Sequence, residues 1–158
     1  MNIKHLLAAL PFLVSWCALA APFTVSADGQ EVTDAKTGLI WRRCVEGMTA
    51  SAGGCTGSLG GFTHEAALVR ASTQAAATGV AWRLPNVKEL SSIADKSRSD
   101  PAMDETAFPD ARASLPFWSS SPYAGSASAA WCATYTNGLV RTCSRDSIIY
   151  VRLVRAGQ

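Results

Sequence analysis

The amino-acid sequence predicts an α+β fold, with two helices packed on a mostly antiparallel sheet that uses both ends of the chain. Three observations support this prediction. Residues 63–79 show helical spacing between a capping threonine and a terminating glycine. Short apolar runs bounded by turn residues lie near the two ends, at residues 23–26 and 148–154. Two further runs flank an Asn-Gly pair at residues 137–138, the pair preferred in two-residue hairpin turns.

Residues 1–20 have the pattern of a cleaved signal peptide. Lys4 precedes an apolar run over residues 6–19, and the Ala-Leu-Ala tripeptide at 18–20 fits a signal-peptidase site. The run is shorter than the roughly 20 residues of a membrane-spanning helix. We therefore expect an exported protein, in the periplasm, on the cell surface or outside the cell. It should have one domain over residues 21–158 and no membrane span after cleavage.

The charge of the chain gives no reason to expect nucleic acid as a partner. The sequence has 14 basic and 12 acidic side chains, and one of the basic residues is Lys4 of the predicted signal peptide. A nearly neutral domain has no strong field that would attract a polyanion at a distance. Recognition of an anion would have to come from a local cluster of arginines.

Four cysteines follow the signal peptide: Cys44, Cys55, Cys132 and Cys143. An even number in an exported chain predicts disulfides, with three pairings open. Zinc is the competing interpretation, but the chain has no C-x-x-C pair, and one histidine, His64, remains after the signal peptide. Pairing about a two-residue turn at 137–138 places Cys132 opposite Cys143, within disulfide range. That site would be a hydrogen-bonded pair, which suits a disulfide less well, so a longer loop stays open. Cys44–Cys55 follows by elimination.

The first half of the chain is expected to contain two strands, a loop and a helix. The strands should cover residues 23–26 and 39–45, with turns at 28–29 and 34–38. The segment 45–61 is rich in Gly, Ser and Thr, and we expect a loop held by its two cysteines. Thr63 should cap a helix that ends near Thr78. Its apolar stripe has helical spacing and consists of Ala67, Leu68, Ala71 and Ala75.

A strand-to-helix corner follows at residues 82–90. Pro85 keeps the residue before it extended, and Asn86 with Glu89 has the spacing of a capping box. The second helix should run from Val87 to about Asp95, with an inward face of Val87, Leu90, Ile93 and Ala94. Residues 96–116 are expected to form a surface loop. Residues 117–119 begin a strand, and residues 122–128 break it before the hairpin. In the last strand, 148–154, the residues Ile149, Val151 and Leu153 share one face, and Tyr150 and Arg152 share the other.

Several motifs in this order resemble a known family. They are Thr33-Asp34-x-x-Thr37-Gly38-Leu39-Ile40-Trp41, Trp82-Arg83-Leu84-Pro85 with Lys88-Glu89-Leu90, the run Phe117 to Ser121, and Tyr150-Val151-Arg152-Leu153-Val154-Arg155. The chain resembles the Lcl C-terminal domain family, which is bacterial and exported, over about residues 31–155. The resemblance implies a C-type-lectin-like fold, distantly similar to formylglycine-generating enzymes, with paired termini. The namesake of the family is a collagen-like adhesin whose domain binds sulfated glycosaminoglycans, but this chain has no collagen repeat.

The sequence offers little support for catalysis. An activity like that of formylglycine-generating enzymes needs reactive cysteines, and Cys132 and Cys143 would be inert if they form a disulfide. A Ser-His-Asp triad would have His64 as its only base after signal cleavage, and no G-x-S-x-G elbow surrounds a serine. We therefore expect a protein that is not an enzyme and needs no cofactor.

Calcium is the second metal that the sequence leads us to consider, after zinc. Four carboxylates gather in the predicted loop after the second helix: Asp100, Asp104, Glu105 and Asp110. Carboxylate oxygens are the ligands that Ca²⁺ accepts. However, the spacing of an EF-hand loop and the Glu-Pro-Asn and Trp-Asn-Asp motifs of calcium-dependent lectins are missing. A solvated acidic loop is the simpler interpretation.

Two sets of residues are candidates for ligand binding. Arg141 and Arg145, with Arg112, could form a basic patch for sulfate or carboxylate groups. Trp118 and Tyr123 flank a turn and are candidates to stack on a sugar ring, burial being the alternative for Trp118. We therefore expect an exported, disulfide-stapled, adhesin-like module that binds a sulfated or acidic glycan or a protein partner. A structural subunit of an envelope or pilus-like assembly is the alternative.

Overall fold

The computed structural model describes residues 22–51, 53–111 and 114–157. The predicted signal peptide and Arg112 lie outside these residues. The described chain contains two helices, α1 (His64–Thr78) and α2 (Val87–Ser92), and short strands before, between and after them. The strands are β1 (Phe23–Val25), β2 (Glu31–Asp34), β3 (Leu39–Arg42), β4 (Met48–Ser51), β5 (Gly54–Gly57), β6 (Gly61–Phe62), β7 (Phe117–Pro122), β8 (Ala129–Thr134), β9 (Leu139–Ser144), β10 (Ile149–Tyr150) and β11 (Val154–Ala156).

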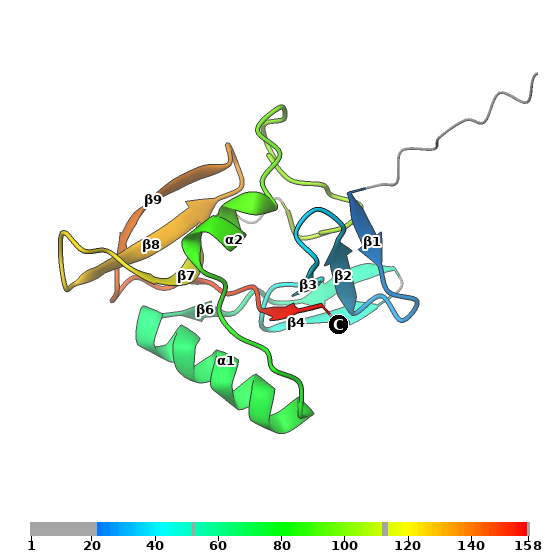
Figure 1. Ribbon diagram of the computed structural model, residues 1–158, viewed down its shortest axis with the longest axis horizontal. Helices are drawn as coiled ribbons and strands as arrows, with labels where there is room; N and C mark the ends of the chain where they lie inside the picture. The colour runs from blue at the N-terminus through cyan, green and yellow to red at the C-terminus, as the bar shows by residue number, and fades with distance from the viewer. Residues whose placement is uncertain (1–21, 52, 112–113, 158) are drawn as a thin grey trace, which may run out of the picture.

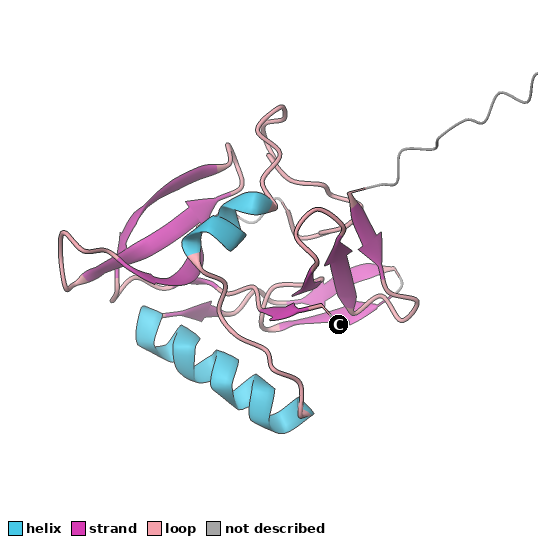
Figure 2. Ribbon diagram, viewed as in Figure 1, coloured by secondary structure: helices cyan, strands magenta, loops and turns pink. Residues whose placement is uncertain are grey.

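The strands form three sheets (Figures 1 and 2). One sheet has the order β1-β2-β3-β11, so the first and last strands of the described chain belong to the same sheet. The second has the order β6-β10-β7-β8-β9, and β4 pairs with β5 in a separate hairpin. Every pair is antiparallel except β10 with β7. The predicted α+β fold with two helices, a mostly antiparallel arrangement and paired ends is confirmed.

Two clusters of buried side chains hold the sheets together. In Figure 1, α2 lies between the β7–β9 group and the β1–β2 group, and α1 runs below β6. The first cluster joins α2 to both groups through Val32, Trp41, Leu90, Ile93, Met103, Phe108, Phe117 and Tyr135. The second lies under α1 and includes Ala67, Ala71, Trp82, Leu84, Trp118, Val151 and Leu153. Burial of these apolar side chains is the main stabilising contribution to the fold.

Both helices begin where the sequence predicts. The Thr63 side chain accepts a hydrogen bond from the Ala66 amide, and Gly79 ends α1 in the left-handed conformation. Asn86 and Glu89 form the expected capping box of α2. Two details differ from the prediction. Leu68 is 41% exposed instead of facing the core, and α2 ends at Ser92 instead of near Asp95.

The structure corrects the prediction in three places before and after α1. Segment 45–61 contains the β4–β5 hairpin where we expected a loop. Strand β2 lies between the two predicted turns and was not expected. The strand expected at Trp82 is reduced to an isolated bridge, in which Arg83 exchanges two hydrogen bonds of 2.9 Å with Val154. Glycine-rich and very short strands carry little periodicity, which is why the sequence pattern does not reveal them.

We expected residues 96–116 to form a surface loop, but part of this segment is buried. Its middle part enters the core, where Met103 and Phe108 are fully buried. The Phe108 ring packs edge-on against Phe23 of β1, with 5.3 Å between the ring centroids. The prediction was wrong because prolines and charges mark an irregular backbone, and they say little about whether that backbone is covered.

Both predicted disulfides are present, Cys44–Cys55 and Cys132–Cys143. The hairpin register differs from the one predicted for a two-residue turn at residues 137–138. Thr134 pairs with Leu139, so residues 135–138 form a four-residue loop, and Cys132 lies opposite Arg141. The disulfide therefore joins diagonal neighbours, with 6.0 Å between the Cα atoms. A shift of two residues keeps every side chain on its predicted face.

The last predicted strand is divided. Residues 149–150 belong to β10 and residues 154–156 to β11, with an irregular stretch between them. Ile149, Val151 and Leu153 enter the second cluster, as their common face predicts. Tyr150 and Arg152 are also buried, so this segment is covered on both sides. Among the described helices, neither is long and apolar enough to cross a membrane.

Candidate functional site

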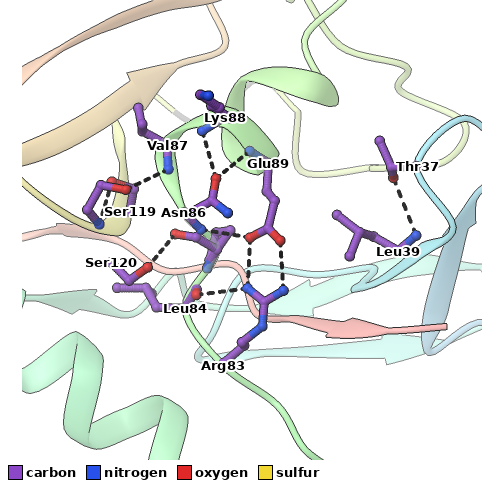
Figure 3. A network of polar contacts seen from close by, with 12 residues as sticks. Thr37, Leu39, Arg83, Leu84, Asn86, Val87, Lys88, Glu89, Ser119 and Ser120 are labelled. Carbon is purple, nitrogen blue, oxygen red and sulfur yellow. Dashed lines mark hydrogen bonds and ion pairs between the residues drawn. The ribbon is translucent and has the colours of Figure 1, made fainter.

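The strand-to-helix corner is held by a compact polar network (Figure 3). The Arg83 guanidinium donates to both carboxylate oxygens of Glu89, each at 2.7 Å. Glu89 also accepts a hydrogen bond of 2.8 Å from the backbone amide of Asn86. The hydrogen bonds from Arg83 lower the pKa of Glu89, against an opposite effect of burial. All these contacts are internal, and they give the corner a structural role.

The predicted aromatic residues occupy different environments. Trp118 is fully buried and donates from Nε1 to the Phe62 carbonyl oxygen at 2.8 Å, so it offers no face to a sugar. Tyr123 is 36% exposed and packs edge-on against Trp131, with 5.3 Å between the centroids. Of the two predicted aromatic residues, Tyr123 alone offers a surface, and half-buried Trp131 lies beside it.

Arg141 does not join this aromatic pair. Arg141 is exposed on β9 opposite Cys132, whereas Trp131 lies opposite Thr142. Neighbouring positions of a strand point to opposite faces, so Arg141 and Trp131 are on different sides of the hairpin. Arg145 follows the end of β9, where its Nε donates to the Ala129 carbonyl oxygen at 3.2 Å. It lines a hollow at the start of α1 together with Thr63, His64, Glu65, Leu68, Ser128 and Asp146.

His64 is buried, whereas a catalytic base would need access to its substrate. Its Nε2 lies 3.0 Å from the Ser119 carbonyl oxygen, and its ring packs edge-on against Trp118 at 5.0 Å. Burial is the largest cause that lowers the pKa of His64, and the charge of Arg145 adds to it. A hydrogen bond to the Ser119 carbonyl oxygen fixes the neutral ring with its proton on Nε2. A ring buried in this way is not accessible as a base from the solvent.

The four predicted carboxylates are dispersed. Asp110 is buried, where it accepts from the Val45 amide and pairs with Arg152. Asp104 accepts from the amides of Thr106 and Ala107 at 2.8 and 3.1 Å. Within residues 22–51, 53–111 and 114–157, no three His, Cys, Asp or Glu side chains are grouped to hold a metal ion. Asp110 is thus committed to the core, and the predicted calcium ligands do not converge.

A polar groove that the sequence did not reveal lies between α1, β3 and the β4–β5 hairpin. We call it the Arg42 groove. It is lined by Gln30, Arg42, Cys44, Val45, Glu46, Gly47, Met48, Thr49, Ala50, Arg70 and Gln74. Arg70 and Gln74 are four residues apart on α1 and therefore share a helix face. The spacing of Arg70 and Gln74 is the local feature of the sequence that places two lining residues together. The other lining residues come together through tertiary structure.

Comparison with protein-family models matches residues 30–155 to the Lcl C-terminal domain. Comparisons with curated proteins and with solved structures returned no match. The C-type-lectin-like fold implied by the sequence resemblance therefore stays a prediction, while the matched range covers the core elements from β2 to most of β11.

Proposed function

The chain belongs to the Lcl C-terminal domain family, and from that membership we propose that it is an exported, disulfide-stabilised binding module that recognises an acidic glycan. Two disulfides fit a protein that works in an oxidising compartment. The proposal treats the protein as a receptor that does not transform its ligand.

The state of the nucleophilic groups supports binding over catalysis. All four cysteines of the described chain are paired in disulfides, so none is available as a thiolate. His64 is buried with a backbone carbonyl as its Nε2 partner. The groups that an enzyme related to formylglycine-generating enzymes, or a serine hydrolase, would require are thus engaged in structure.

The exposed guanidinium of Arg141 is the observation on which the proposal rests. Arg141 lies on the outer strand of its sheet, and Arg145 follows four residues later at the end of that strand. Guanidinium groups bind sulfate and carboxylate oxygens through paired hydrogen bonds. Two such groups at one edge of the molecule could contact neighbouring charges of an extended polyanion.

Heparin chromatography tests this proposal. We expect the exported protein to bind a heparin column at low salt, because salt screens exposed charges. Replacing Arg141 and Arg145 by glutamine should move elution to lower salt. The control combines Lys88→Gln with Arg98→Gln, which removes the same number of positive charges from exposed positions elsewhere. Passage of the wild-type protein through the column at low salt, or equal shifts for the arginine pair and the control, would overturn the proposal.

A structural subunit of an envelope or pilus-like assembly is the second candidate. The observation in its favour is the free edge of β9, six residues long, with Leu139 58% exposed. Unpaired strand edges can add a strand from another chain. Light scattering after size-exclusion chromatography tests it, since an assembly subunit should form a defined oligomer that Leu139→Lys dissociates. A monomer at all concentrations would exclude this candidate.

A further inference from the structure

We propose that the Arg42 groove binds a single hydroxylated sugar acid, with the Arg42 guanidinium receiving its carboxylate. This groove differs from the Arg141 surface of the proposed function, and either assignment can fail without the other. The inference rests on three properties of the groove: fixed walls, one uncompensated positive charge, and neutral polar side chains around that charge.

The walls of the groove are held in place by covalent and backbone contacts. The Cys44–Cys55 disulfide ties β5 to the end of β3. At the base of the hairpin, the Gly60 amide donates to the Glu46 carbonyl oxygen at 2.8 Å. The opposite wall is α1, joined to Glu46 by an ion pair with Arg70 of 2.6 Å. A binding site with fixed walls loses little conformational entropy when a ligand enters.

Arg42 supplies a positive charge that no described side chain neutralises. Its guanidinium carbon lies 4.5 Å from the centre of the Trp82 ring, which orients the group without using its N–H donors. No hydrogen bond or ion pair from the side chain is made to the described residues, and Nε is buried without a partner. Glu46 is already paired with Arg70. Glu31, which lies opposite Arg42 in the β2–β3 register, is paired with Arg155. Asp28 accepts from the Ser26 hydroxyl and from the Gln30 backbone amide.

The surrounding side chains fit hydroxyl groups. Gln30 donates from Nε2 to the Ala50 carbonyl oxygen at 2.6 Å, which fixes the amide and leaves its carbonyl oxygen as an acceptor. Gln74 makes no side-chain hydrogen bond to the described residues, so its amide can donate and accept. The groove volume of about 290 Å³ is at the small end of ligand sites, which span roughly 300–1,000 Å³. This size fits one sugar ring.

The arrangement favours a carboxylate over a sulfate. A carboxylate has two coplanar oxygens, which match the fork of one guanidinium. A sulfate has a third oxygen, and the charge of the second guanidinium of the groove, that of Arg70, is already paired with Glu46 through Nε. One unpaired guanidinium, with two side-chain amides in the same groove, therefore points to a sugar acid of the uronic type.

Titration of the ¹⁵N-labelled exported protein with glucuronate, glucose and glucose 6-sulfate tests the inference by NMR. Glucuronate should shift the amide signals of Gly47 and Thr49 and the side-chain amide of Gln74, and glucose should not. Arg42→Gln should weaken glucuronate binding at least about tenfold, since it removes a charge-assisted hydrogen bond. Gln74→Ala should weaken it about threefold, through loss of a neutral hydrogen bond, in a helix that tolerates alanine.

Matched variants separate this site from the Arg141 surface. Arg141→Gln should bind glucuronate like the wild-type protein, and Arg42→Gln should bind dextran sulfate, a polyanion without uronic acid, like the wild-type protein. If Arg42→Gln fails to fold, Gln74→Ala decides. The inference is overturned if glucuronate shifts no signal of the groove, if Gln74→Ala binds as tightly as wild type, or if glucose or glucose 6-sulfate binds as tightly as glucuronate.

Discussion

His64 packs against Trp118 with its Nε2 3.0 Å from the Ser119 carbonyl oxygen. It occupies the first position of α1. Burial comes from the sheet that packs beneath the helix, and the sequence near position 64 gives no sign of it. Among the described residues, its Nδ1 has no hydrogen-bond partner, and burial disfavours the charged form of the ring.

The stability of the protein should fall when the pH drops below 6.5, the ordinary pKa of histidine. Because burial lowers the pKa of His64 in the folded state, the unfolded state takes up the proton first. The loss of unfolding free energy should begin near the unfolded value and end at the lower folded value. Urea unfolding between pH 5 and 8, with NMR titration of the ring, measures it.

His64→Gln is the control for this pH dependence of stability. A glutamine side-chain amide can donate to the Ser119 carbonyl oxygen, but it does not titrate. Its stability should change less than that of wild type between pH 8 and 5. Equal slopes in the two proteins, or a ring pKa above 6.5 in the folded state, would contradict the prediction.

The β4–β5 hairpin shows how an element can depend on a close backbone approach. Gly47 has a positive φ of 95°, and a Cβ atom there would lie 2.6 Å from the Gly60 nitrogen. Gly38 also has a positive φ, 71°, but a Cβ atom there would meet nothing within 4 Å. The two glycines therefore separate conformational strain from steric exclusion.

Gly38→Ala should lower the free energy of unfolding by about 1–2 kcal/mol, the cost of a side chain in the left-handed region. Gly47→Ala should lower it by more, because the new methyl group also displaces the Gly60 backbone from its hydrogen bond with Glu46. Urea unfolding of both variants measures the difference. Equal losses would show that the close approach relaxes at no cost.

At the scale of elements, the sequence predicts those that depend on neighbouring residues. Asn86 and Glu89 cap α2 through contacts within one turn, so their spacing is sufficient to find them. The register of the β8–β9 hairpin was harder to predict from the sequence. Asn137-Gly138 marks a turn, but the chain forms a four-residue loop with Tyr135 buried inside it. Tyr135 donates to the Leu90 carbonyl oxygen at 2.8 Å, a contact with α2 that the hairpin sequence does not contain.

Across the whole molecule, two buried arginines connect segments that are distant in the chain. Arg152 donates to the Arg42 and Arg43 carbonyl oxygens and pairs with Asp110. Arg43 donates to the carbonyl oxygens of Ser51, Thr106 and Ala107. These contacts hold segment 96–116 against β3 and β4. Arg152, which belongs to the family motif at 150–155, thus has a structural role in this chain.

Asp110→Asn should lower the free energy of unfolding by about 3–5 kcal/mol, because it leaves the buried Arg152 charge without its partner. The control is Asp146→Asn, which neutralises an exposed carboxylate and should change stability by about 0.5 kcal/mol or less. Urea unfolding at pH 7 gives both values. A loss below about 1 kcal/mol for Asp110→Asn would show that the pair contributes little to holding the loop.

The helix caps, most of the apolar faces, the disulfide pairs and the family could be predicted from the sequence, because each depends on spacing over a few residues or on ordered motifs. Tertiary structure alone decided the course of residues 96–116, the burial of His64 and the Arg42 groove. Their contacts join residues far apart, such as Arg152 and Asp110 at a separation of 42 or Arg43 and Ala107 at 64. Such pairings depend on which cluster each element packs into, which no local pattern encodes. The strand-to-helix corner at 82–90 belongs to both groups, since its capping box is local and its bridge to Val154 is not.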